Sequence, residues 1–457
     1  MLSLVVVSCG LPALAAPQGQ SAPPAPQTQA APPPVTRPAV ATLVPRAEAA
    51  VDALAAKEFA KVFAQFNATV KAALPEEKLR AVWDSVQTQA GAFQRRTGVT
   101  TQVRGDLTAV AVACDFERAK VEVIFIFDAT GEIGGLQMRP APAPAPPYAA
   151  PDYAVASAYT EREVTVGAGE WALPGTLTMP AGAGPFPAIV LVHGSGPNDR
   201  DESFGPNKTF KDLALGLGSR GVAVLRYDKR TKVHGVKIAP LTQFTVKEET
   251  IDDALLAAAL LRKEPGIDPK RIYVLGHSLG GMLAPRIAAA DPSLAGIIVM
   301  AGAVRSLDQS ILDQMTYLAN ADGVVSEAEQ NTLAGARQTI ETVKALTSAD
   351  AASGKGISGG PASYWLDLRG YNPPAHAATL KTRILVLQGA RDYQVTVEDF
   401  EKWKTALAGK ATAEFRLYPT LNHLFLPGEG KSLPAEYSKP GHVPVDVIND
   451  IAAWARK

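Results

Sequence analysis

A chain of 457 residues is long enough for more than one domain, and its hydrophobic fraction of 47% is typical of globular protein. Its 45 basic and 45 acidic side chains balance, and no basic stripe or acidic tail indicates nucleic acid or another strongly charged partner. The two cysteines, Cys9 and Cys114, exclude a disulfide framework in a processed chain.

Residues 1–16 are apolar and end in small residues, as the last part of a secretory signal peptide does. This run is far shorter than the ~20 residues of a membrane span. Cleavage after Ala13-Leu14-Ala15 would release a soluble protein. Alternatively, Val6-Val7-Ser8-Cys9 resembles a lipobox, in which Cys9 is acylated and tethers the chain to a membrane, or Cys9 is one more small residue of the run. In each case we expect export, to the periplasm or the cell exterior.

Two proline-rich tracts, 17–46 and 140–153, separate the folded parts. Such tracts bury too little apolar surface to fold and act as extended spacers. We therefore predict one folded domain at 47–139 and a second at 154–457.

The first domain, 47–139, begins with two segments of helical periodicity, 47–74 and 75–93, and continues with alternating strand-like runs. This order predicts a small α+β domain with two helices and an antiparallel sheet. Its size, order and position resemble a domain of unknown function that often precedes bacterial hydrolase domains. It shows no catalytic constellation, and we expect Cys114 to pack as a small hydrophobe. A packing or substrate-presenting role follows.

The second domain alternates continuous apolar strands with helices from "PFPAIVLVHG" to the final helix "VPVDVINDIAAWARK". Because strands of this kind are buried on both faces, the pattern predicts an α/β fold with a mostly parallel, doubly wound sheet.

A helical insertion at about 303–376 interrupts this alternation where strand ends should open, and we expect it to act as a lid over a pocket. Part of it, "NADGVVSEAE", resembles a calcium loop, but the first ligand position would be Leu318. Ser326 and Glu329 instead form a capping box. We therefore predict a helical hairpin without metal.

The candidate nucleophile is Ser278 in "GHSLGG", a G-x-S-x-G pattern formed with Gly276 and Gly280. The serine follows the strand "RIYVLG" and precedes a helix, which is the strand–turn–helix context that a nucleophile elbow requires. The start of the following helix favours a developing negative charge. We predict that Ser278 is a reactive nucleophile.

A serine nucleophile needs a base, and the base needs an orienting acid; after such an elbow they follow in the order acid, then histidine. Asp392 comes directly after the strand "RILVLQG". His423 lies a few residues after the strand "AEFRLYP", among apolar residues, whereas His442 stands at the entry to the last helix. We predict Asp392 as the acid and His423 as the base.

The glycines of "HGSG" after the first long strand allow backbone N–H groups to turn toward a substrate oxygen. We predict an oxyanion hole made by the N–H groups of Ser195 and Leu279, the latter following the nucleophile. His193 and His277 flank this site as supporting groups or as part of the substrate pocket.

Several motifs, "HGSGPNDRDES", "GHSLGG", "SYWLDLRGYNP", "LVLQGARDYQV" and "LNHLF", together resemble a family of bacterial α/β-hydrolase esterases. The family lies near the dienelactone-hydrolase and S9/S33-type peptidase groups, and the resemblance spans most of 160–457. It implies an α/β-hydrolase fold and a serine carboxylesterase with Ser278, Asp392 and His423 as catalytic triad.

The resemblance also implies that Trp365, Leu366 and Tyr371 line the substrate pocket from the lid. "NDRD" (198–201) and "YDKR" (227–230) would form an ionic framework beside it or serve the fold alone; both readings stay open.

The expected substrate is a small or medium carboxylic ester, hydrolysed through an acyl-enzyme. No H-E-x-x-H or C-x-x-C is present, and no G-x-G-x-x-G opens a dinucleotide unit, so we expect neither metal nor organic cofactor. Fold and triad do not choose between esters and amides, which leaves a serine peptidase as an alternative. A third hypothesis is a non-enzymatic binding protein of the cell envelope.

Overall fold

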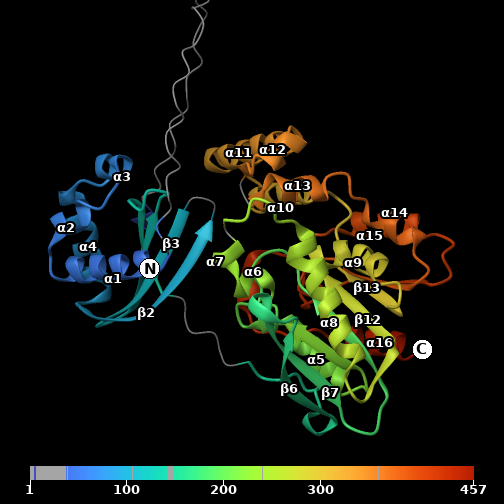
Figure 1. The fold of residues 1–457 in the computed structure, drawn as a ribbon. Coiled ribbons are helices and arrows are strands. Elements are labelled where there is room, and N and C mark those ends of the chain that lie inside the picture. The colour runs from blue at the N-terminus through green and yellow to red at the C-terminus, as the bar shows by residue number, and fades with distance from the viewer. Residues whose placement is uncertain are drawn as a thin grey trace, which may run out of the picture. The chain divides into compact units, whose positions relative to one another are not determined.

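The computed structural model describes residues 5–6, 38, 40–104, 107–141, 148–238, 240–357 and 360–457. Contacts divide the chain into two compact units, Met1–Pro144 and Ala145–Lys457 (Figure 1). Cys9, the cleavage site at 13–15, most of the tract 17–46 and residues 142–147 of the second tract lie outside the described residues. Within the described ones, no helix combines the length and apolar character that crossing a membrane requires.

The first unit packs helices against one face of an antiparallel sheet with strand order β1-β5-β4-β3-β2. Its core includes Trp83 and Phe125, both fully buried. The strands are β1 (Val5–Val6), β2 (Phe93–Arg104), β3 (Leu107–Phe116), β4 (Lys120–Phe127) and β5 (Ile133–Pro140), and the helices are α1 (Val40–Ala55), α2 (Phe59–Phe63), α3 (Ala68–Ala73) and α4 (Glu76–Ala90). Cys114 is buried as a small apolar side chain in this core.

Two boundaries differ from those predicted. The spacer does not reach residue 46, because α1 begins at Val40, where Leu43 is buried in the core and Pro45 is tolerated inside the helix. The predicted helix 47–74 is divided into α1, α2 and α3. The chain turns at Lys57, which has a φ of +61°, and the Asn67 side chain accepts a hydrogen bond from the Val70 amide to start α3.

The second unit is built on an eight-stranded sheet, counted over its described residues, with the order β17-β16-β13-β12-β8-β11-β7-β6. Strands β8 to β17 of this sheet are parallel, while β7 and β6 continue the edge antiparallel. The predicted doubly wound, mostly parallel sheet is therefore confirmed. The strands are β6 (Tyr159–Val166), β7 (Leu173–Pro180), β8 (Phe186–Val192), β11 (Ala223–Tyr227), β12 (Ile267–His277), β13 (Gly296–Met300), β16 (Arg383–Gly389) and β17 (Ala413–Tyr418).

Helices that follow the strands bury apolar faces against this sheet, and α5 packs on α16 while α8 packs on α9. These helices are α5 (Thr209–Gly218), α8 (Asp252–Arg262), α9 (Leu279–Ala290), α15 (Val397–Ala406) and α16 (Val445–Arg456). Short elements complete the unit: hairpin β9 (Ser203–Phe204) and β10 (Asn207–Lys208), α6 (Arg230–Val233), α7 (Gly235–Ile238) and a π-helical turn, Lys247–Ile251, that leads into α8.

The insertion lies between β13 and β16, as predicted, and is mainly helical (Figure 1). The pair α10 and α11 packs together, and Ser326 and Glu329 form the predicted capping box at the start of α11. Its elements are α10 (Leu307–Ala319), α11 (Glu327–Lys344), α12 (Ser348–Ala352), β14 (Gly356–Ile357), β15 (Gly360–Pro361), α13 (Ala362–Leu368) and α14 (Pro373–Thr379).

Candidate active site

Ser278 occupies a sharp turn between β12, which ends at His277, and α9, which begins at Leu279. Its φ of +53° lies in a region that side chains rarely adopt. The turn is closed by glycines: a Cβ on Gly276 would lie 2.1 Å from the Gly280 carbonyl oxygen. The Ser278 amide donates to Met300 O at 2.9 Å. The strained turn expected of a nucleophile elbow is therefore present.

Asp392 and His423 follow the neighbouring strands β16 and β17, and Asp392 Oδ2 lies 2.7 Å from His423 Nδ1. Both side chains are buried. The other carboxylate oxygen of Asp392 accepts hydrogen bonds from the amides of Gln394 and Val395 at 2.8 and 3.0 Å. The carboxylate is thus an acceptor held in place, which makes Nδ1 of His423 the protonated nitrogen and leaves Nε2 as the basic one.

His442 is used elsewhere, since its Nδ1 pairs with Asp212 at 3.0 Å at the start of α16. His423 instead lies at the same sheet edge as Ser278. Its ring centroid is 4.8 Å from that of His277, the residue directly before the serine. Three strand ends, those of β12, β16 and β17, therefore bring Ser278, Asp392 and His423 to one edge.

His277 joins two loops of the site. Its Nδ1 forms an ion pair with Glu202 Oε2 at 2.9 Å, and its Nε2 lies 2.9 Å from the backbone oxygen of His423. The Glu202 carboxylate and the His423 carbonyl oxygen both lie close to this ring and favour its charged form. Burial opposes the charge, but the Glu202 carboxylate outweighs it and raises the pKa of His277. Burial likewise raises the pKa of Glu202, yet the positive His277 ring leaves it lowered on balance.

Both predicted flanking histidines are buried, His193 being 1% and His277 3% exposed. Burial lowers the pKa of His193 to about 4, and its Nε2 lies 2.9 Å from the Asp199 carbonyl oxygen. Sequence reasoning missed Glu202. In the sequence it is one acidic residue among several in "PNDRDES". Its partner, His277, lies 75 positions later in the chain.

The loop after β8 lies against Ser278, since a Cβ on Gly194 would come within 3.1 Å of Ser278 Cβ. Ser195 is exposed, and Leu279 is the first residue of α9, where helix amides lack intrahelical acceptors. In the part of the chain that the structure describes, neither of these two amides donates to a protein acceptor. Both are therefore available to an oxygen atom of a bound molecule.

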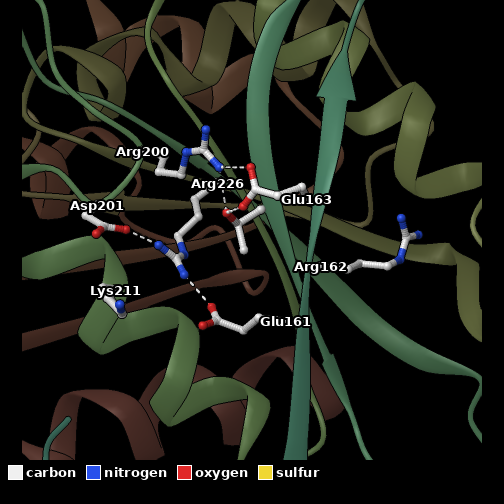
Figure 2. Close-up of a pocket in the computed structure, with 8 residues that line it drawn as sticks. Glu161, Arg162, Glu163, Arg200, Asp201, Lys211 and Arg226 are labelled. Carbon is white, nitrogen blue, oxygen red and sulfur yellow. Dashed lines mark hydrogen bonds and ion pairs between the residues drawn. The ribbon is translucent and has the colours of Figure 1, made fainter.

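Around this loop the segments 198–201 and 227–230 do form an ionic framework. Asp228 binds Arg200, Lys229 binds Glu249, and Arg226 binds Asp201. Part of it lines a cavity of about 320 Å³ beside β6 and β7, in which Arg200 reaches Glu163, and Arg226 bridges Asp201 and Glu161 (Figure 2). These ion pairs connect the edge strand β6, which carries Glu161 and Glu163, to Arg226 and to Arg200 in the loop.

The two aromatic residues of the insertion that were predicted to line the pocket have packing partners in the protein. Trp365 is 7% exposed and packs in a small core within the insertion, together with Val343 and Leu346. The Tyr371 hydroxyl donates to the Met282 carbonyl on α9 at 3.1 Å, and its ring lies under Arg286. The insertion has a small hydrophobic core of its own. Similar sequence motifs could not show which of its residues form that core.

Comparisons with known proteins identify relatives of both units. Residues 189–439 match the model of the alpha/beta hydrolase family, and residues 47–136 match a family described as a protein of unknown function (DUF3887). Esterase EstD of Thermotoga maritima is 38% identical over 407 residues, which cover 89% of this chain and 94% of that protein.

Two solved structures are more distant. The dienelactone hydrolase of Anabaena variabilis has a TM-score of 0.39 at 18% identity, and the match covers 65% of this chain and 97% of that one. The acylaminoacyl peptidase of Pyrococcus horikoshii has a TM-score of 0.42 at 14% identity, with 72% of this chain and 52% of that one covered.

Proposed function

Because the chain belongs to the alpha/beta hydrolase family and is a hydrolase, we propose that it is a serine carboxylesterase for small to medium carboxylic esters. The observation that carries this proposal is the buried pair of Asp392 and His423, 2.7 Å apart, at the sheet edge that also bears the strained turn of Ser278. The esterase from Thermotoga maritima, similar along most of its length, supports an ester as substrate.

In the proposed reaction, Ser278 Oγ attacks the ester carbonyl carbon while His423 Nε2 takes the hydroxyl proton. Asp392 holds the ring through Nδ1 and stabilises its charged form. His423 then protonates the leaving alcohol, which yields an acyl-enzyme. A water molecule, deprotonated by the same nitrogen, attacks the acyl-enzyme and releases the acid.

The negative charge that develops on the carbonyl oxygen needs hydrogen-bond donors in place beforehand. We assign this role to the N–H groups of Ser195 and Leu279, which have no protein acceptor in the described residues. Loss of one such donor typically costs on the order of 3 kcal/mol in the transition state.

The insertion, α10 to α14, is proposed as a lid that limits which esters enter. It begins at the carboxyl end of β13, and Ser278 follows the carboxyl end of the neighbouring parallel strand β12, which supports this role. Trp365 would act by fixing the insertion's shape, and Tyr371 by holding the insertion against α9.

Export is proposed from the signal-like residues 1–16. Expression of the full chain in a bacterial host, followed by intact-mass measurement of the mature protein, tests it. A mass that begins at residue 16 indicates cleavage after Ala15, and a lipid adduct lost in Cys9→Ser indicates acylation. An unprocessed chain recovered entirely from the cytoplasm would refute export.

A panel of p-nitrophenyl acyl esters of increasing chain length, set beside aminoacyl p-nitroanilides, tests the activity. We expect ester hydrolysis by the wild type and a fall in kcat of at least about 10⁴-fold in Ser278→Ala. The control is Ser293→Ala, an exposed serine after α9, which should keep wild-type rates.

Preference for the anilides would replace the esterase with a serine peptidase. Absence of both activities in a folded protein would favour a non-enzymatic binding protein of the envelope.

A further inference from the structure

A buried lysine touches the loop that carries the proposed oxyanion donor. Lys229 follows β11 and is 2% exposed. Its Nζ lies 2.8 Å from the Gly194 carbonyl oxygen and 3.0 Å from Glu249 Oε1. Its backbone amide donates to Asn198 O at 3.1 Å. One residue therefore binds the loop at two points, and the reaction described above makes no use of it.

A lysine in such a place requires an explanation, because removing an ammonium group from water is expensive unless it is paired. Glu249 supplies the pairing charge and is itself buried. Its second oxygen accepts a hydrogen bond from the Tyr364 hydroxyl at 2.8 Å. Tyr364 belongs to α13, so the same carboxylate joins the lysine to the insertion.

The lysine contact fixes a peptide group. A trans peptide is planar, so the Gly194 C=O and the Ser195 N–H point in opposite directions. The Gly194 oxygen accepts from Lys229 Nζ and, at 3.2 Å, from Asn198 Nδ2. The Ser195 N–H must then point away from both donors.

The preceding peptide is held as well, because the Gly194 amide donates to Glu202 Oε1 at 2.9 Å. Gly194 lies against Ser278, and the Ser195 amide has no acceptor in the described part of the chain. Two consecutive peptide groups beside the nucleophile are thus oriented by buried charged side chains.

We propose that Lys229, held in place by Glu249, is a positioning residue that sets the Gly194–Ser195 peptide so that the Ser195 N–H faces the developing oxyanion. This inference rests on the proposed esterase function. Lys229 touches no substrate; it acts through the peptide.

Kinetics of Lys229→Met test the proposal, with Lys232→Met as control, because Lys232 is an exposed lysine three residues along. A misplaced donor weakens transition-state binding and leaves ground-state binding largely intact. We expect kcat for a p-nitrophenyl ester to fall about 10- to 100-fold with KM changed less than about threefold. Affinity for an aryl trifluoromethyl ketone, which forms a tetrahedral adduct, should fall by the same factor as kcat/KM.

The single variant leaves Glu249 buried without a partner, and that alone can destabilise the fold. The double variant Lys229→Met/Glu249→Gln removes both charges and should show the same loss of kcat in a folded protein. Tyr364→Phe, which keeps the ion pair of Lys229 and Glu249, should lose less activity than the single or the double variant. A folded Lys229 variant whose kcat and ketone affinity stay within threefold of wild type would overturn the proposal.

Hydrogen exchange gives a readout that needs no activity. Amide exchange in a peptide covering 194–198 should be faster in Lys229→Met than in the wild type and unchanged in Lys232→Met. Unchanged exchange in Lys229→Met contradicts the positioning role even if the protein is an esterase. Full ester hydrolysis by Ser278→Ala would instead refute the proposed function. The exchange result would then still decide whether Lys229 holds the 194–198 loop in place.

Discussion

Ser278 and Glu202 both have left-handed backbone angles, with φ of +53° and +48°, although neither is glycine. Such conformations cost about 1–3 kcal/mol each and persist only where the surroundings impose them. Packing of Gly276 against Gly280 imposes the first, and the contacts of Glu202 with Gly194 and His277 accompany the second. Two residues of the proposed site thus have strained backbone, as do Lys57, Ala301 and Phe425 elsewhere in the described chain.

Replacing Asp392 by asparagine tests the orientation of the base. An amide in place of the carboxylate favours the wrong tautomer of His423 and no longer stabilises its charged form. We expect kcat to fall about 10⁴-fold with the fold retained, measured by ester hydrolysis and thermal unfolding. Asp322→Asn, in the exposed turn before α11, serves as control. A variant within tenfold of the wild-type kcat would mean that another group orients the ring.

The ion pair of His277 and Glu202 predicts a pH dependence of stability. The pKa of His277 is raised in the folded state, so its contribution is fully present below about 6.5, the unfolded value, and is lost as pH rises through the folded pKa. The pKa of Glu202 is lowered, so its contribution is present above about 4.5 and is lost as pH falls through the lower value.

Urea unfolding of wild type and His277→Gln between pH 5 and 9 checks this prediction. The difference in unfolding free energy between the two proteins should be largest below about pH 6.5 and shrink toward alkaline pH. A difference that grows with pH would show that His277 is neutral in the fold.

Among the elements, the turn from β12 to α9 tolerates least change. A Cβ on Gly276 would lie 2.1 Å from a backbone oxygen of α9, and backbone cannot move aside cheaply. Gly276→Ala should therefore cost at least about 3 kcal/mol of stability, seen as a lower midpoint in urea unfolding.

Gly335→Ala is the matched substitution in exposed helix α11, where the added Cβ meets no atom within 4 Å. It should stabilise the protein by about 0.5–1 kcal/mol. Equal unfolding midpoints for the two variants would contradict the tight packing at Gly276.

The fold of the second unit and the positions of its proposed catalytic residues could be predicted from the sequence, because both follow from local patterns. Continuous apolar strands predict the parallel sheet, and the turns after them place Ser278, Asp392 and His423 at strand ends. The interrupted helices α1 to α3 could not be predicted, because Lys57 at +61° carries no turn signature. Glu202 was missed, and Lys229 was predicted only as a member of an ionic framework, for another reason: their specific contacts with His277 and Glu249 exist only in the folded chain.

At the scale of the whole molecule, each of the two units has a hydrophobic core of its own. The proposed catalytic residues, with Glu202 and Lys229, all belong to the second unit. Tyr148, which lies within the predicted spacer 140–153, donates to Asp212 at 2.7 Å, so the second unit includes the last residues of that predicted spacer.

A truncated chain that begins at Ala145 should therefore fold and hydrolyse p-nitrophenyl esters with kcat/KM within about threefold of the full chain. Circular dichroism and the ester assay check this outcome. A folded but inactive truncated chain would assign the first unit a part in the reaction.

The central claim, that Ser278 is the nucleophile of a serine hydrolase, is tested most directly by locating a fluorophosphonate adduct. The wild-type protein is treated with the probe, digested and examined by mass spectrometry. We expect one adduct, on Ser278 in the peptide that contains "GHSLGG", and no adduct in Ser278→Ala. An adduct on another residue, or equal labelling of Ser278→Ala, would contradict it.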